Sequence, residues 1–172
     1  MFVPARPGVF QSIELSPNEG HKLTIDIVPL TATDRAAWET LAIGYKTFYQ
    51  TPLPPEEYET AWQRLLRNDR VHALGAKRDG ELVGIAHFLF HTSAWAPKVC
   101  YLQDLFVVPE ARGHGVAHAL IDAVAVEARN RDASRFYWQT KESNETARKL
   151  YDRVATFNGF IRYDYPLDPP VT

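Results

Sequence analysis

The spacing of apolar and polar residues changes several times along the chain, and each change predicts a new element. Between residues 22 and 30, the apolar side chains of Leu23, Ile25 and Ile27 are separated by polar or charged ones. An alternation of this kind is typical of a strand with one buried face. Residues 22–30 are therefore expected to form the first strand of a sheet.

Two helices are predicted after this strand. Thr33 or Asp34 provides a side chain that caps a helix N-terminus, and this helix would extend to about Tyr49. Prolines then interrupt the chain. Pro55, with the two glutamates that follow it, suits the first turn of a second helix, which would end near Asn68. The chain thus has two consecutive helices between its first and second strands.

A hairpin and a further strand come next. Runs rich in β-forming residues occupy 71–77 and 82–90, and they are joined by Asp79 and Gly80 with one residue on either side. Asp-Gly between two such runs is the strongest short-range signal for a hairpin. A third apolar run begins at about Val99 and ends at a proline, which predicts another strand.

The remainder of the chain alternates helices with strands. Apolar residues at helical spacing predict a helix over 113–130, followed by a short strand over 136–140. A polar cap at residue 143 or 144 starts a helix that reaches about 155, and a last strand is predicted over 159–165. The order β-α-α-β-β-β-α-β-α-β combines antiparallel hairpin pairing with parallel crossovers. It predicts an α/β fold with a mixed sheet between helices on both faces, a three-layer α/β/α sandwich.

Composition narrows the class of protein. The chain has 172 residues and a balance of 45% hydrophobic and 23% charged residues, which indicates one globular domain over residues 22–172 preceded by a loose arm over 1–21. A net charge of −2 offers no general attraction for nucleic acid or membrane surfaces. The single cysteine, Cys100, excludes an internal disulfide framework and a cysteine-built zinc site; no metal is expected. With no apolar segment of membrane-spanning length and no signal-peptide pattern, a cytoplasmic protein is expected.

One stretch carries the clearest chemistry. After the apolar strand, the segment Arg112-Gly113-His114-Gly115-Val116-Ala117 leads through a glycine-rich bend into a helix. The bend would place consecutive backbone N–H groups at the positive end of the helix dipole, where a phosphate group binds well. The alternative is that Gly113 merely begins a helix after a turn.

The chain resembles the GNAT superfamily of N-acetyltransferases. The segment 112–117 matches the family pattern Gln/Arg-x-x-Gly-x-Gly/Ala, and residues 105–109 match the strand that precedes it. The pattern Asn-x-x-Ala-x-x-Leu-Tyr recurs at residues 144–151, and Gly159-Phe160 matches the closing Gly-Phe. Tyr101–Val107 is most similar to the diamine and small histone-acetylating branch. The resemblance covers residues 22–166 and implies the GNAT fold, with acetyl-coenzyme A as cofactor.

The resemblance also assigns roles to particular residues. It implies that Asn144 orients the cofactor and that Tyr151 acts as the general acid that protonates the leaving thiolate. The pyrophosphate and pantetheine of coenzyme A would be bound by Arg112, Gly113, His114, Gly115, Val116 and Ala117, and by backbone groups of Leu105, Phe106 and Val107 where two parallel strands separate. Those last three side chains are equally expected to pack in the core.

The general base is the weakest point of this assignment. Relatives of the diamine branch carry Glu-Asp where this chain has Gln103 and Asp104, and a glutamine side chain cannot accept a proton. Asp104 is therefore expected to orient the substrate ammonium or to act through water. His87 and His91 share a strand face and are alternative bases, as is a chain of water molecules.

The acceptor remains open between several amines. Aromatic residues and carboxylates of the first two helices would suit a cationic amine, although they could equally be core aromatics and a solvated helix start. These residues are Tyr45, Phe48, Tyr49, Glu56, Glu57, Tyr58, Glu59 and Trp62. The expected reaction is acetyl transfer to a polyamine-like amine or a protein lysine by direct attack in a ternary complex. The alternatives are an amino acid or aminoglycoside acceptor, or a non-catalytic coenzyme A-binding module. A homodimer is also expected, because family members often dimerise.

Overall fold

A computed structural model of the chain describes residues 11–15, 23–68 and 70–167. The chain divides into two compact units, Met1–Gln139 and Thr140–Thr172. The first unit contains the sheet and the helices that cover it. The second contains one helix and an extended segment. Among the described residues, no helix is both long enough and apolar enough to cross a membrane.

The first unit is organised around one six-stranded sheet whose strands follow the order of the sequence. All neighbouring strands are antiparallel except the last pair, which is parallel, so the predicted mixed sheet is confirmed. The strands are β1 (Gln11–Leu15), β2 (Leu23–Pro29), β3 (Val71–Arg78), β4 (Glu81–Ser93), β5 (Ala96–Val107) and β6 (Phe136–Trp138).

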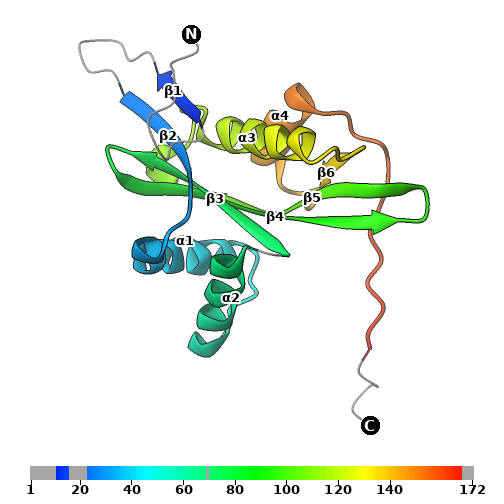
Figure 1. Cartoon of the computed structure of the whole chain (residues 1–172), viewed down its shortest axis with the longest axis horizontal. Coiled ribbons are helices and arrows are strands. Elements are labelled where there is room, and N and C mark those ends of the chain that lie inside the picture. The colour runs from blue at the N-terminus through cyan, green and yellow to red at the C-terminus, as the bar shows by residue number, and fades with distance from the viewer. Residues whose placement is uncertain (1–10, 16–22, 69, 168–172) are drawn as a thin grey trace. The chain divides into compact units, whose positions relative to one another are not determined.

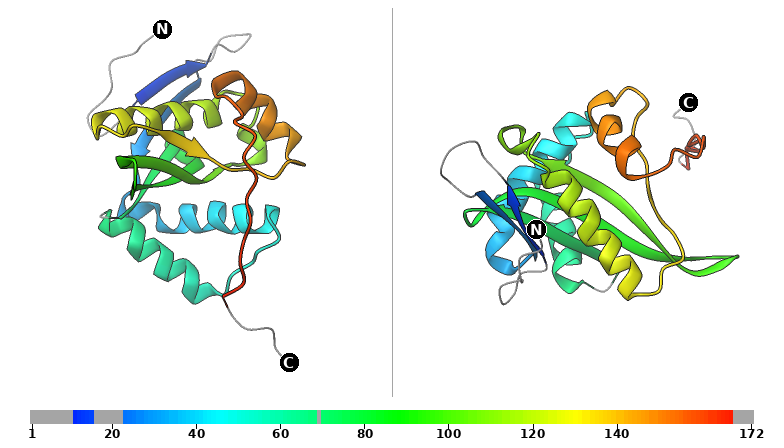
Figure 2. Two further views of the ribbon diagram at one scale, coloured as in Figure 1. Left: turned by 90° about the vertical axis from the view of Figure 1, so that its right-hand side faces the viewer. Right: turned by 90° about the horizontal axis from the view of Figure 1, so that it is seen from above.

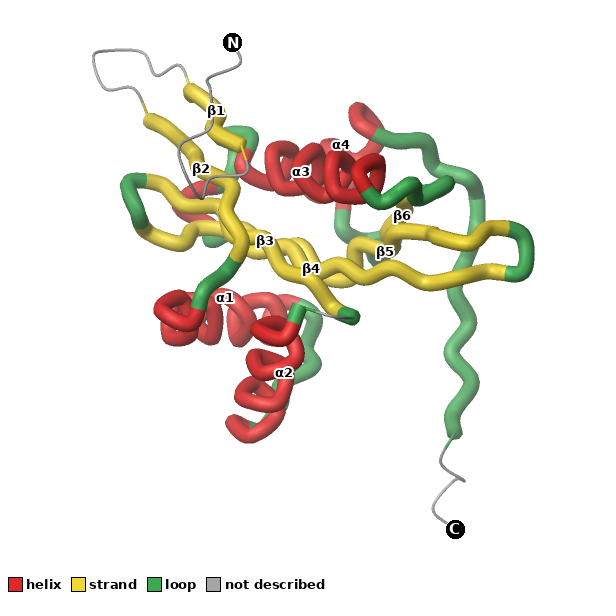
Figure 3. Tube along the Cα trace, viewed as in Figure 1, coloured by secondary structure: helices red, strands yellow, loops and turns green. Residues whose placement is uncertain are grey.

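Helices cover both faces of this sheet, as predicted for a three-layer sandwich. Figure 1 shows α3 (Val116–Asn130) on one face, and α1 (Arg35–Phe48) and α2 (Pro55–Arg67) on the other. The views in Figure 2 and the tube in Figure 3 agree on these layers. Short 3-10 helices at Ala32–Asp34 and Pro109–Ala111 lead into α1 and toward α3.

Two glycines let the layers approach closely. A Cβ on Gly84 of β4 would lie 3.1 Å from side-chain atoms of both Val116 and Leu120, so α3 packs directly over this strand. A Cβ on Gly44 of α1 would lie 2.8 Å from the ring of Phe106, so α1 packs equally closely over β5. The close packing excludes water from the core, where each fully buried large apolar side chain contributes roughly 1.5–3 kcal/mol.

A buried carboxylate fixes the start of α1 against the sheet. The backbone N–H of Thr31 donates to Asp34 Oδ2 at 2.8 Å, and Lys77 Nζ of β3 lies 2.6 Å from Asp34 Oδ1. Burial alone would raise the pKa of Asp34, but the hydrogen bonds from Lys77 and Thr31 and the charge of Lys77 outweigh it and hold the pKa below its ordinary value. Asp34 therefore joins α1 to β3 as an ionised group.

The two ends of the chain differ from the predictions. Within the predicted loose arm, Gln11–Leu15 forms β1, because β2 offers a free edge on which it completes an antiparallel ladder; the rest of that arm lies outside the described residues. In the second unit, α4 (Glu145–Val154) forms as predicted. The predicted strand over 159–165 is wrong: these residues have no regular secondary structure and pair with no strand among the described residues, and a strand is stable only with a partner.

Candidate active site

The segment between β5 and α3 forms the bend that the glycines predict. Gly113 and Gly115 both have φ of 77°, a left-handed conformation that costs other residues about 1–2 kcal/mol. Gly115 is the N-cap of α3, and no side chain of the described residues caps this helix end. The first helical bond runs from Ala119 N–H to Gly115 C=O at 2.9 Å. The N–H groups of the first turn thus have no partner within the helix.

The bend that leads into this first turn lies at the surface. Residues 112–115 are exposed, and a Cβ built on Gly113 would meet no atom within 4 Å. Uncapped N–H groups at the positive end of a 15-residue helix attract an anion. The geometry therefore favours an anion-binding bend over a mere turn, because a simple turn would not require an uncapped, exposed helix start.

Arg112 folds back onto the end of β5. Its Nε donates to the Val107 carbonyl at 3.0 Å, and its guanidinium lies 5.7 Å from the centroid of the Phe106 ring. The side chain therefore links the glycine bend to the strand before it. Its guanidinium therefore lies at the end of β5, and its contribution to anion binding stays a prediction.

The edge of β5 is open along the predicted pantetheine segment. Parallel pairing with β6 covers only Cys100 to Leu102, whereas β5 continues to Val107. Val108 N–H donates to Val83 of β4 at 3.0 Å, so the alternating backbone groups of Val107 and Leu105 point away from β4. The strands therefore separate where the resemblance implied. This leaves the N–H and C=O of Leu105 and the N–H of Val107 facing the open edge, while the Val107 carbonyl accepts from Arg112. Phe106 packs against α1, which confirms the predicted core role of its side chain, while the predicted contacts of this segment with the cofactor stay a prediction.

A β-bulge at Gln103 sets the direction of the residues that follow it. His87 pairs with Asp104, while the next residue of β4, Phe88, pairs with Leu102, which leaves Gln103 as the extra residue. Gln103 is exposed as a result. Asp104 lies opposite His87 and shares its sheet face, the one covered by α1.

Asp104 is the last of three side chains that are joined by hydrogen bonds. Trp38 Nε1–H of α1 donates to His87 Nε2 at 2.9 Å. An indole N–H can only donate, so His87 Nε2 must be the acceptor and its proton must lie on Nδ1. That Nδ1–H donates to Asp104 Oδ2 at 2.9 Å. The three side chains thus fix one neutral tautomer of His87, with Trp38 only 1% and His87 only 8% exposed.

The same carboxylate receives further donors. The hydroxyl of Tyr45 donates to Asp104, and Gln103 Nε2 lies 3.4 Å from Oδ2. Burial by itself would raise the pKa of Asp104, but the His87 and Tyr45 hydrogen bonds and the positive charge of Lys46 outweigh it and keep the pKa below its ordinary value. Burial and the neighbouring negative charge of Asp104 raise the pKa of Tyr45. At neutral pH, Asp104 is therefore ionised and Tyr45 is protonated.

The two histidine candidates for the general base differ in environment. Both ring nitrogens of His87 are occupied, which removes it as a free base. His91 Nε2 lies 3.2 Å from the Tyr137 hydroxyl, and its ring packs edge-on against Tyr137. Trp38 was not singled out from the sequence. The usable signal is that a buried tryptophan needs an acceptor for its N–H, and a strand histidine can provide one.

Only part of the residue set that was predicted to bind the amine acceptor lies near Asp104. Tyr45 and Tyr49 pack together with ring centroids 4.9 Å apart, and Tyr101 packs at 5.0 Å on Tyr137 of β6. The other residues of this set are buried in the core, paired with another residue or exposed to solvent. Tyr58 and Trp62 are buried in the core, Glu59 pairs with Arg35 at 3.1 Å, and Glu56 and Glu57 are exposed in the first turn of α2.

In the second unit, Asn144 and Tyr151 lie on α4. The Asn144 side chain accepts from Ala147 N–H at 3.4 Å and donates to Thr140 Oγ1 at 3.1 Å, so it caps the helix. Seven residues separate it from Tyr151, and the two share one helix face. Their roles toward the cofactor stay predictions. In the first unit, Cys100 is fully buried, and burial raises the pKa of its thiol to about 12, so it is no nucleophile.

Comparison with known proteins now decides the family. The model of the Acetyltransferase (GNAT) family matches residues 37–157, most of the chain. The chain belongs to this family. A D-amino-acid N-acetyltransferase of Saccharomyces cerevisiae is 33% identical over 149 residues, which cover 82% of this chain and 92% of that protein. The mouse thialysine N-epsilon-acetyltransferase is 32% identical over 81 residues, 47% of this chain and 48% of that protein.

Solved structures of this GNAT fold agree. A ribosomal-protein-alanine N-acetyltransferase from Brucella melitensis aligns with a TM-score of 0.70 at 27% identity, covering 83% of this chain and 99% of that one. An aminoglycoside N-acetyltransferase in complex with coenzyme A aligns with a TM-score of 0.73 at 21% identity, covering 90% and 100%, a likeness of fold alone. The protein is therefore an acetyl-CoA-dependent N-acetyltransferase, as the sequence predicted.

The first unit offers what acetyl-CoA requires. The uncapped N–H groups at the start of α3 suit its pyrophosphate, and the open edge of β5 suits the amide groups of its pantetheine arm. When bound, the cofactor supplies the acetyl thioester. The residue-by-residue assignment of these contacts remains a prediction, which a glycine substitution tests.

Replacing Gly113 by alanine should weaken coenzyme A binding about tenfold, because the added methyl group and the strained φ both oppose close approach of the pyrophosphate. Isothermal titration calorimetry measures this change. Gly80 is a matched control, since it has φ of 85° in the hairpin turn and equally open space around its Cβ position. Gly80→Ala should cost similar stability and leave coenzyme A affinity unchanged. Equal affinity in both variants would exclude the bend from the cofactor site.

Proposed function

We propose that this N-acetyltransferase acts on a small primary amine that binds as an ammonium ion at Asp104. The observation that carries the proposal is a carboxylate kept ionised in a half-buried position beside Tyr45 and Tyr101. A cation is stabilised there by the carboxylate charge and by the faces of the aromatic rings. The open edge of β5 begins at the next residues of the same strand, so the amine and the acetyl group would meet along β5.

In this proposal, Asp104 positions the amine more than it deprotonates it. A carboxylate whose pKa is held low is a weak base. Its oxygens, already oriented by His87 and Tyr45, would accept N–H bonds of the amine and direct its nitrogen, while solvent water removes the proton. In a ternary complex the nitrogen bonds to the acetyl carbon and the carbon–sulfur bond breaks. Tyr151 would donate its Oη proton to the departing thiolate, as the resemblance implies.

An amino acid is the second candidate acceptor. Lys46 is close enough to Asp104 to lower its pKa by its charge, and its Nζ lies 5.9 Å from the centroid of the Tyr45 ring. An acceptor with neighbouring ammonium and carboxylate groups would find one partner in Asp104 and the other in Lys46. The similarity to a D-amino-acid N-acetyltransferase favours this candidate.

A substrate panel separates these acceptors. Release of free thiol from acetyl-CoA is followed with spermidine, with D- and L-amino acids and with a lysine peptide. Asp104→Asn should reduce kcat/KM for every amine used by about 100-fold, because a charged partner worth several kcal/mol is lost. Lys46→Gln should reduce it only for amino acids. Coenzyme A binding without turnover on any amine would indicate a non-catalytic module and would refute the proposed function.

Trp38→Phe tests whether the tautomer of His87 matters. Without the indole donor, His87 Nε2 can take a proton, and the resulting imidazolium would neutralise Asp104. We therefore expect kcat/KM of the variant to fall at a higher pH than that of the unmodified enzyme when the solution is made acidic. In the unmodified enzyme Asp104 stays charged to lower pH.

The matched control for Trp38→Phe is Trp62→Phe. The two tryptophans are buried in one cluster with ring centroids 5.0 Å apart, so both changes remove similar core volume. Only the first breaks the hydrogen bond to His87. Profiles of the same shape in both variants would show that Trp38 has a packing role alone.

Tyr151→Phe should lower kcat by about 100-fold while leaving the Kd for coenzyme A within twofold, because only the proton donor is removed. Pre-steady-state thiol release measures the chemical step directly. Tyr163 of the same unit is 86% exposed and provides the control, since Tyr163→Phe should retain full activity. An unchanged rate in Tyr151→Phe would remove this residue from the mechanism.

We further propose a cytoplasmic homodimer formed through the C-terminal segment. Large apolar side chains of this segment are between 86% and 92% exposed, an unfavourable state for a single chain: Phe160, Tyr163, Tyr165 and Leu167. A second copy could bury them and offer its edge strand β6 for pairing. Light scattering of the full chain and of a chain ending at residue 158 compares the two masses; a monomer in both would contradict the dimer.

A further inference from the structure

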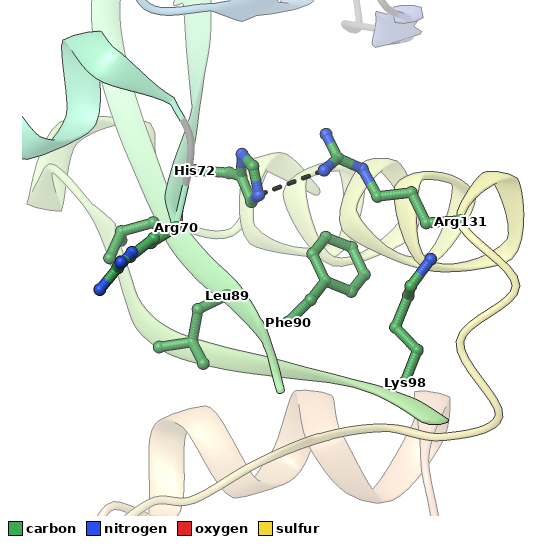
Figure 4. A pocket seen from close by; sticks show the side chains of 7 residues that line it. Arg70, His72, Leu89, Phe90, Lys98 and Arg131 are labelled. Carbon is green, nitrogen blue, oxygen red and sulfur yellow. Dashed lines mark hydrogen bonds between the residues drawn. The ribbon is translucent and has the colours of Figure 1, made fainter. Parts of the chain in front are cut away.

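A basic pocket lies in the first unit at the end of the sheet away from the cofactor bend. It has a volume of about 380 Å³, within the range of roughly 300–1,000 Å³ typical of small-molecule sites. It lies between the start of β3, the end of β4, the start of β5 and the C-terminal end of α3 (Figure 4). The residues that line it are Arg70, Val71, His72, Leu89, Phe90, Lys98 and Arg131.

Positive charge dominates this pocket. Of the seven described residues that line it, three are cationic and none is acidic. Arg131 has a counter-ion in Glu127, whose carboxylate lies 3.3 Å from Nε. In the described part of the chain, no carboxylate pairs with Arg70 or Lys98. Gathering cations without equal counter-charge is unfavourable, and a bound anion would relieve the repulsion.

Arg131 is held in place before any ligand binds. Its Nη1 donates to His72 Nε2 at 3.2 Å, the contact drawn in Figure 4. The guanidinium also lies 4.9 Å from the centroid of the Phe90 ring. Because an arginine only donates, His72 accepts at Nε2 and directs its Nδ1 proton to Asn68 Oδ1. Within the described residues, the Nη2 group of Arg131 makes no hydrogen bond, so it remains free for an anion.

The pocket is separate from the reaction site. Arg131 follows the last residue of α3, whereas the cofactor bend precedes its first residue, and a 15-residue helix spans about 22 Å. Lys98 likewise precedes Asp104 by six residues of β5, about 20 Å of extended strand. Neither the cofactor pyrophosphate nor the carboxylate of a small acceptor bound at Asp104 would reach these cations.

We propose that this pocket binds a second ligand, a small molecule carrying a phosphate group. Two or three cationic side chains match the double negative charge of a phosphate monoester, and guanidinium groups donate to its oxygens in pairs. The apolar side chains of Val71, Leu89 and Phe90 would contact the organic part. The ligand would bind independently of acetyl-CoA and of the amine acceptor.

The test uses phenyl phosphate as the probe and two-dimensional amide NMR as the readout. The protein is saturated with coenzyme A and kept at constant ionic strength, so the cofactor bend is occupied. Resonances of residues 71, 90, 98 and 131 should shift saturably, and inorganic phosphate should produce the same shifts with weaker affinity. Shifts confined to residues 113–117, or no saturable shift, would overturn the proposal.

Substitutions provide the second half of the test. Arg70→Gln combined with Lys98→Gln should weaken phenyl phosphate binding at least tenfold, while acetyl transfer stays unchanged. Arg129→Gln is the matched control, because Arg129 lies in the last turn of α3 but does not line the pocket. It should bind the probe like the unmodified protein. If the double variant binds as tightly as the control, the cations do not form a site. Should the double variant fail to give a folded spectrum, Lys98→Gln alone replaces it, with a several-fold loss expected.

Discussion

The hydrogen bond from the Trp38 indole to His87 is a constraint on which the arrangement of the acceptor site depends. An indole nitrogen has no lone pair to offer, so this single contact decides the tautomer of a histidine buried between a helix and the sheet. The tautomer in turn decides that Asp104 receives a proton donor and remains a carboxylate. A hydrophobic core residue thereby controls the charge of a group that faces the proposed substrate. The indole N–H of Trp38 thus links the packing of the core to the charge of Asp104.

The end of β5 and the start of α3 both have backbone groups that make no hydrogen bond within the described part of the fold. β5 pairs with β4 along most of its length, but β6 pairs only with Cys100 to Leu102, so the last residues of β5 have one free edge. The helix that follows begins without a capping side chain. Unpaired backbone groups are costly in a closed core but useful at a surface that receives a ligand rich in phosphates and amides. The open edge of β5 and the uncapped start of α3 lie on one continuous stretch of chain.

Much of this architecture could be predicted from the sequence. Periodicity gave the helices of the first unit and the central strands, and the glycines at 113 and 115 pointed to the bend because only they tolerate its backbone. The features that could not be predicted are those that depend on residues far apart in the sequence. β1 exists because β2 offers an edge, and residues 159–165 join no strand in the described part of the chain because an alternating pattern specifies no neighbour. The bulge at Gln103 and the contact between Trp38 and His87, residues 49 positions apart, leave no local signal in the sequence.

The extra residue at Gln103 also governs the half of β5 that follows it. In a regular strand, successive side chains point to opposite faces, so an inserted residue reverses the facing of everything downstream. Asp104 lies beneath α1, and the backbone groups of Leu105 and the N–H of Val107 point to the open edge, only because the count is shifted by one. The strand therefore joins two segments whose side chains alternate in opposite register: the first pairs with both β4 and β6, and the second has the open edge proposed for the cofactor. Residue count, as much as residue identity, is thus under constraint in this strand.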